Sequence, residues 1–158
     1  MLANRETLYA AVFALFSDAA DFKTTGRRVK TWADVDVDRQ PALFMAQAGE
    51  LAVRDRKGLP TKWEIAVKLY LYCRAENDQD AIGPVINPLL DTITQLVETK
   101  AAPTVDDPGA RRPLLPGETN DLGIAGVSHC WINGNIETDE GALGSQGVAI
   151  IPISILAA

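Results

Sequence analysis

His129 and Cys130 are adjacent in the sequence and are the first residues to consider for chemistry, because a thiol activated by an imidazole is a common nucleophile. His129 is the only histidine, and Cys73 is the other cysteine. Residues 127–132 have the composition of a β-strand, in which neighbouring side chains point to opposite faces, so the imidazole would not take a proton directly from the adjacent thiol. The sequence therefore predicts a structural histidine and two buried free thiols.

The acidic segment around residue 36 is the main candidate for a metal site. Asp34, Asp36 and Asp38 alternate like the start of a calcium loop, but the sixth and twelfth positions are Arg39 and Met45 where such a loop needs Gly and Glu. One histidine with two distant cysteines is also too few ligands for a closed zinc site. We expect these aspartates to form an exposed acidic edge in an extended segment.

The glycines at positions 141, 144 and 147 are spaced by three, as in some phosphate-binding loops. No lysine and no helical pattern follow them, and the Gly-x-Ser-x-Gly spacing of a nucleophile elbow is absent. The sequence thus predicts no catalytic residue, no cofactor and no metal, and it predicts that the protein is not an enzyme.

The composition predicts one globular domain over residues 1–158. The formal charge is −6 and the pI is near 4.7, which argues against binding nucleic acid by neutralising phosphates. No apolar run reaches the roughly 18–20 residues that a membrane helix needs, and no signal-peptide pattern is present, so we expect no membrane partner.

The apolar side chains from Trp63 to Cys73 alternate without a break, which predicts a long, half-buried β-strand. We place the remaining elements relative to this strand. The apolar run 42–53 precedes it, and the polar residues 54–60 between them have turn chemistry. The two runs predict a long projecting β-hairpin with a charged tip.

Apolar residues recur at helical spacing in 4–16 and again in 82–97, where Pro88 predicts that the second helix restarts with Asn87 as its N-cap. Further strands are expected at 27–32, 127–132 and 148–156, with Pro152 at an edge or bulge, and residues 101–126 predict a long Pro/Gly-rich mobile loop. The sum is an α+β fold: a mostly antiparallel sheet with two amphipathic helices packed on one face.

Tyr70 and Tyr72 fall on the polar side of the alternating strand, where they would offer the rigid amphipathic area that is enriched at protein interfaces. Together with the hairpin, the long loop and the lack of a catalytic cluster, they favour an assembly protein over an enzyme.

The order of segments resembles the tail terminator, or tail completion, proteins of long-tailed bacteriophages, of the lambda-terminator type. The resemblance covers nearly the whole chain and is carried by R-R-V-K-T-W-A-D-V at 27–35, Q-P-A-L-F at 40–44, the strand 63–72, I-N-P-L-L-D-T-I at 86–93, V-S-H-C-W-I-N-G-N-I at 127–136 and A-I-I-P-I-S-I-L at 149–156. Residues 101–120 depart from the shorter connection expected in that family.

The resemblance implies a virion protein at the neck, assembled in the host cytoplasm. It would form a homo-hexameric ring that caps the tail tube, ends its polymerisation and meets the head connector, while DNA passes through the lumen without sequence-specific binding. A lumen lined with carboxylates would repel phosphates, which the acidic composition favours. The ring needs a head-to-tail interface.

For that interface we expect a contact between basic and acidic groups of neighbouring subunits. The candidate interface residues are Arg54, Arg56 and Lys57 at the hairpin tip, the acidic groups Asp34, Asp36, Asp38, Asp139 and Glu140, the tyrosines Tyr70 and Tyr72, and the local basic pair Arg111 and Arg112.

Two other functions remain open at this point. A head-side neck or connector protein would share the size, acidity and ring. A small α+β hydrolase or ligand-binding domain would use His129, Cys130 and nearby carboxylates.

Overall fold

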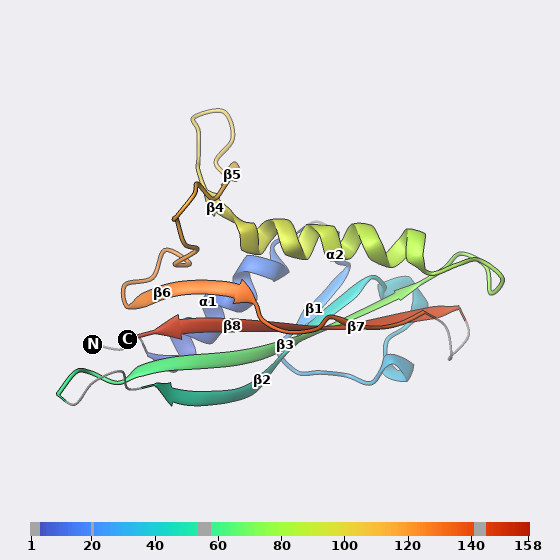
Figure 1. Cartoon of the computed structure of the whole chain (residues 1–158). Helices are drawn as coiled ribbons and strands as arrows, with labels where there is room; N and C mark the ends of the chain where they lie inside the picture. Colours follow the sequence, from blue (N-terminus) through green and yellow to red (C-terminus); the bar gives the residue numbers. More distant parts are fainter. Residues whose placement is uncertain (1–3, 20, 54–57, 141–144) are drawn as a thin grey trace.

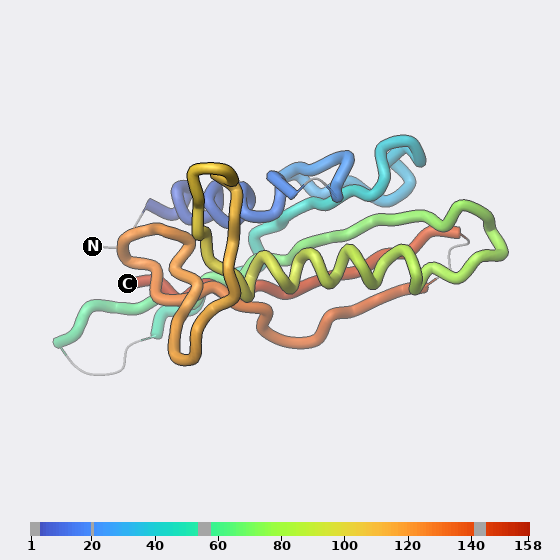
Figure 2. The backbone as a smooth tube through the Cα atoms, turned by 90° about the horizontal axis from the view of Figure 1, so that it is seen from above, coloured from blue at the N-terminus to red at the C-terminus, as the bar shows by residue number. Residues whose placement is uncertain are grey.

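The computed structural model describes residues 4–19, 21–53, 58–140 and 145–158. Two helices lie on one face of a sheet whose strand order is β1-β2-β3-β8-β6, with β7 pairing to β8 (Figures 1 and 2). In chain order the elements are α1 (Arg5–Ser17), β1 (Thr24–Gly26), the 3-10 turns η1 (Trp32–Asp34) and η2 (Val37–Arg39), β2 (Ala42–Val53), β3 (Lys62–Arg74), α2 (Gly83–Glu98), β4 (Thr99–Ala101), β5 (Arg111–Pro113), β6 (Val127–Ile132), β7 (Glu137–Asp139) and β8 (Gln146–Ala157). The predicted α+β fold is confirmed.

The antiparallel pairing of β2 with β3 forms the predicted hairpin, and β8 pairs with the other side of β3 along nearly its whole length. The alternation read from the sequence is confirmed on the side that faces the helices, where Ile65, Val67 and Leu69 are at most 1% exposed. Those side chains and the apolar faces of α1 and α2 form the main hydrophobic core.

Helix α1 begins where the sequence predicts. The Asn4 side chain accepts a hydrogen bond from the Glu6 backbone N–H at 2.8 Å, so it caps the first turn. Its buried residues Leu8, Val12 and Phe16 recur at the spacing of one helix face.

Helix α2 differs from the prediction, because it begins at Gly83 and runs through Pro88 without a restart. Pro88 has no N–H to donate to the carbonyl of Pro84 in the first turn of the helix. Because Pro88 is exposed, water can bond to that carbonyl instead. The buried residues Ile86 and Ile93 lie on either side of Pro88, so packing on the sheet holds the helix together across it.

Three segments do not have the predicted backbone. The strand expected at 27–32 is wrong: the strand is Thr24–Gly26, and the charged residues after it lead into η1. Residues 34–38 are not extended, since they belong to two 3-10 turns that bury Val35 between them, so the three aspartates do not share one strand face. Residues 101–126 are not free of secondary structure, because β4 and β5 form a small separate sheet.

Strand β8 is longer than predicted and has neighbours on both sides, although it contains Pro152. Strands β6 and β7 pair with different parts of β8, Ile153 onwards for β6 and Val148–Ile150 for β7. Pro152 lies in the gap between them, with only its carbonyl bonded on that side, to the Asn133 N–H at 3.0 Å. The missing N–H therefore breaks no ladder bond, as expected for a proline at an irregularity.

Candidate assembly surfaces

The sheet face that the helices leave open is the first candidate surface. It carries the alternate side chains of β3 and β8 together with His129 and Trp131 of β6, whose rings stack with centroids 5.3 Å apart. Ile150, Leu156 and Trp131 are partly exposed on it, whereas the residue before each of them in the sequence is buried in the core. Partly exposed apolar and aromatic side chains on one sheet face are typical of a surface that packs against a partner.

One end of this open face is covered by the protein's own chain. Tyr72 is 6% exposed and packs with Val35, Ala42 and Phe44 in a second hydrophobic cluster. Its hydroxyl donates to the Lys30 carbonyl at 2.8 Å, and burial raises its pKa. The expectation that Tyr72 points outward is therefore wrong, because residues 30–35 fold over it. Tyr70, on the same face, is half-buried.

The free part of β2 is the second candidate surface. Strand β1 pairs with β2 only at residues 42–44, while β3 pairs with the other side of β2 from Ala42 to Val53. Residues 47–52 are all exposed, although Arg5 and Tyr9 of α1 bind the Glu50 carboxylate on this end of the hairpin. The predicted projection of the hairpin is confirmed up to Val53; its tip, with Arg54, Arg56 and Lys57, lies outside the described residues.

A projecting arm is the third candidate surface. Strands β4 and β5 extend beyond the end of α2 and stand clear of the body of the protein (Figure 1). The arm is continued by a bond from the Ala102 N–H to the Ala110 carbonyl at 2.8 Å. Its end is closed by Asp107, whose backbone N–H bonds to Thr104 Oγ1 and whose carboxylate accepts from the Gly109 N–H. Next to this turn, Val105 is 99% exposed.

The basic pair predicted as interface fixes the base of this arm. Arg111 donates to the carbonyls of Leu96 and Thr99 at the end of α2, at 3.1 and 2.8 Å, and burial lowers its pKa. Arg112 makes a bidentate ion pair with Glu118, with both N–O distances at 2.7 Å, which lowers the pKa of Glu118 to about 2. Both arginines are therefore committed within the chain, and their role is to brace the arm.

The acidic residues proposed for the interface do not form one group. Asp34 accepts from the Thr31 hydroxyl at 2.7 Å, and Asp36 lies 3.9 Å from Arg39. Asp34, Asp36 and Asp38 are all exposed, as are Asp139 at the end of β7 and Glu140 after it. The structure thus leaves these side chains on the surface but distributes them over separate turns.

The structure separates His129 and Cys130 as the strand pattern predicts. Cys130 is fully buried in the core, and desolvation raises the pKa of its thiol to about 12. His129 Nδ1 accepts a hydrogen bond from the Asn120 N–H at 3.1 Å on the opposite side of the strand. This geometry gives the thiol no base and no access to a substrate. Within the part of the chain that the structure describes, no three His, Cys, Asp or Glu residues are placed to hold a metal ion.

No protein-family model matches this chain, and no curated protein matches it either. None of the described helices is long and apolar enough to cross a membrane.

Sequence reasoning missed the arm and overestimated the tyrosine pair. The Asp107-Pro108-Gly109 sequence was a usable signal for the arm, because this residue combination favours a tight turn. No local signal reveals that residues 30–35 cover Tyr72, since that contact joins residues far apart in the chain.

Proposed function

We propose that this protein is a structural virion subunit that assembles as a ring on the head-proximal end of a phage tail tube, ends the polymerisation of the tube and forms the tail side of the head–tail joint. The observation that carries the proposal is that the protein has two different exposed surfaces on two of its sides. The unpaired edge of β2 lies on one side of the sheet and the β4–β5 arm rises beyond the other (Figure 1).

A ring of identical subunits requires this kind of asymmetry. Each subunit in a cyclic ring presents one surface to the neighbour ahead and a different, complementary surface to the neighbour behind. A protein that dimerises through a two-fold axis needs only one self-complementary patch. Two unlike surfaces on opposite sides of one small domain therefore support a ring over a closed dimer.

The sheet face without helices supports the same proposal. It offers a mixed surface, with Trp131 and Ile150 partly exposed beside the polar Glu64 and Lys68, that a second protein layer such as the tube could cover. The net charge of −6 favours a lumen through which DNA slides without adhering. The sequence segments that resemble tail terminators lie on β2, β3, α2, β6 and β8, apart from 27–35, which leads into and includes η1.

Electron microscopy of the gold-labelled protein mixed with headless tail tubes tests this function. Label confined to one end of each tube, with a ring at that end and no tubes longer than native, is the expected result. Label on isolated heads instead of tubes would replace the proposal with a head-side neck protein. A protein that binds neither heads nor tubes would not be part of the joint.

A further inference from the structure

The exposed end of β2 is an edge strand without lysine or proline, two residue types that commonly prevent pairing with another chain. Bulges and inward-pointing charges also protect edges, and this edge has one irregularity, between Gln47 and Gly49. From Met45 to Val53 the only charged residue is Glu50. Its carboxylate is held by Arg5 Nε at 2.7 Å and by the Tyr9 hydroxyl at 3.2 Å, which turns it toward α1.

The side chains on this end are also suited to a partner. Leu51 is 62% exposed, and its neighbours in residues 47–52 include two alanines and a glycine, which let another backbone approach closely. The irregularity between Gln47 and Gly49 leaves residues 50–53 in regular register with β3. The edge beyond it is therefore in regular register, its one charged side chain, Glu50, is bound by α1, and its outward backbone groups pair with no described strand.

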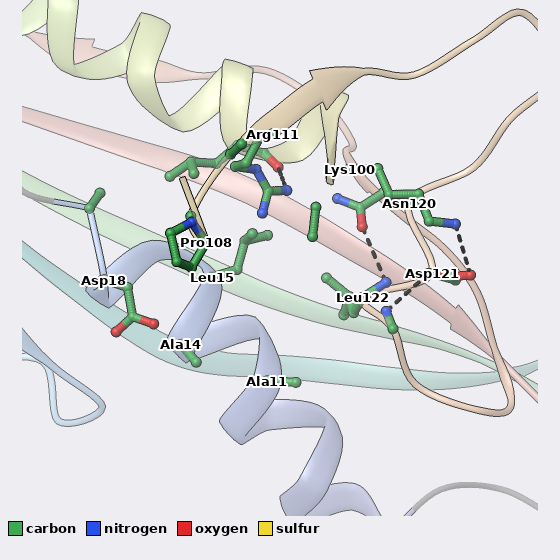
Figure 3. A pocket seen from close by; sticks show the side chains of 16 residues that line it. Ala11, Ala14, Leu15, Asp18, Lys100, Pro108, Arg111, Asn120, Asp121 and Leu122 are labelled. Carbon is green, nitrogen blue, oxygen red and sulfur yellow. Dashed lines mark hydrogen bonds and ion pairs between the residues drawn. The ribbon is translucent and has the colours of Figure 1, made fainter. Parts of the chain in front are cut away.

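A cleft at the base of the arm has complementary properties. It has a volume of about 670 Å³ and lies between α1 on one side and the arm with residues 120–123 on the other (Figure 3). Small and apolar residues line it: Ala11, Ala14, Leu15, Leu96, Pro108 and Leu122.

The charged groups of this cleft are paired or hydrogen-bonded within the chain, apart from one at its border. Lys100 Nζ lies 3.3 Å from Asp121 Oδ2, and the Arg111 guanidinium is held by the carbonyls of Leu96 and Thr99. Asp18, at the end of α1, is exposed and can stay in water. A strand that enters the cleft therefore meets one ion pair and a guanidinium that is already hydrogen-bonded to two carbonyls but keeps its positive charge.

We propose that the projecting end of β2 of one copy docks in the cleft between the arm and α1 of the next copy. This inference rests on the proposed function, because that function supplies the ring into which these contacts would close. Leu51 would cover the apolar floor, and the unpaired edge of β2 would lie beside the extended backbone of the arm, which pairs only with itself among the described strands. The arm is ordered in advance by its Arg112–Glu118 brace, which lowers the entropy lost on binding.

The second copy is the occupant that the observations favour, because both halves of the contact are on this chain, with β2 along one side of the sheet and the β4–β5 arm beyond the other (Figure 1). An edge on one side and a cleft on the other repeat from copy to copy as a head-to-tail contact.

Cysteine cross-linking tests the contact, because the native thiols do not interfere. Cys73 and Cys130 are fully buried, and desolvation raises their pKa values to about 11 and about 12. A chain with both Leu51→Cys and Ala14→Cys, treated with a short bismaleimide, should give a denaturing-gel ladder that rises to the size of the whole ring. Each single variant should give no species larger than a dimer.

A matched control pairs Leu51→Cys with Asp91→Cys, which is exposed on α2 away from the cleft and should give no ladder. A double variant that forms rings in the electron microscope yet gives no ladder would overturn this contact and leave the proposed function standing. A chain that neither forms rings nor binds tube ends would overturn both. Leu51→Asp, a change at an exposed position, should abolish ring formation and leave the circular dichroism spectrum of the subunit unchanged.

Discussion

The two halves of β2 have the same partner on one side and different surroundings everywhere else. From Ala42 to Met45 the strand is buried on both faces, with β1 beside it, the helix layer on one face and residues 30–35 over the other. Residues 47–52 keep β3 as their neighbour but are exposed. The strand is therefore a structural element in its first half and a free edge in its second, although both halves are rich in apolar residues.

The first half of β2 is therefore held by packing on both faces, whereas the second half is held by its pairing with β3. The covered half fixes the register of the hairpin, because a slip by one residue would turn its buried side chains to the wrong face. The uncovered half then extends beyond the core with its geometry already set by β3. A rigid support with an exposed end is suited to presenting an interaction surface.

The largest expected effect comes from comparing two leucines of this strand. Leu43→Ala removes a side chain that is 3% exposed in the core and should lower the free energy of unfolding by about 2–5 kcal/mol. Leu51→Ala, at 62% exposure, should change it by less than about 0.5 kcal/mol in the isolated subunit. Urea denaturation of both variants measures the difference, and equal losses would show that the end of β2 is not free.

A second pair of variants compares the covered body with the arm. A Cβ added at Gly147 would lie 2.3 Å from Ile82 Cγ2 and 3.1 Å from Cys73 Sγ, so Gly147→Ala should cost about 1–3 kcal/mol through overpacking. Gly109→Ala in the arm meets its nearest atom at 3.5 Å and should leave the melting temperature nearly unchanged. A stable Gly147→Ala protein would mean that the start of α2 can move away from β8.

A third comparison concerns the covered and uncovered parts of the open sheet face. Tyr72→Phe removes the hydrogen bond to the Lys30 carbonyl and should cost about 0.5–1.5 kcal/mol. Tyr70→Phe removes a hydroxyl from a half-buried ring on the same face and should cost less. Thermal unfolding of the two variants ranks them, and the reverse order would argue against residues 30–35 as a fixed cover.

The smallest expected effect is the response of the arm to acid. The Arg112 hydrogen bonds hold the pKa of Glu118 at about 2. The ion pair therefore stabilises the arm fully at pH values above the ordinary pKa of a carboxyl group. This stabilisation is lost as the pH falls toward 2. Carboxyl ¹³C NMR should show Glu118 titrating well below the usual carboxyl range, and Arg112→Gln should raise its pKa, because the Arg112 hydrogen bonds are the largest cause of the shift. Because the pair is at the surface, global stability should change little.

Much of the fold follows from periodicity in the sequence. The unbroken alternation from Trp63 to Cys73 predicts β3, the spacing of Leu8, Val12 and Phe16 predicts α1, and both are observed. Local patterns succeed here because the repeat of a strand or helix decides which side chains share a face.

The segments that sequence reasoning placed wrongly are those whose conformation depends on distant contacts. Nothing local predicts that Val35 anchors two 3-10 turns against Phe44, or that packing carries α2 through Pro88. The cleft at the base of the arm is assembled from α1, the end of α2 and residues 108–111 and 120–123, so no single stretch contains its signal.

The sequence by itself determined the secondary structure of the long elements, the burial of the two thiols and the separation of His129 from Cys130. Only the tertiary structure decided which lengths of each strand are covered on the second face as well. Tyr72 is buried because residues 30–35 fold over it, and Leu51 is exposed because it pairs with Glu64 on the sheet face that the helices leave open. The physical reason is that periodicity sets the direction of a side chain, whereas its burial depends on segments that meet only in the folded chain.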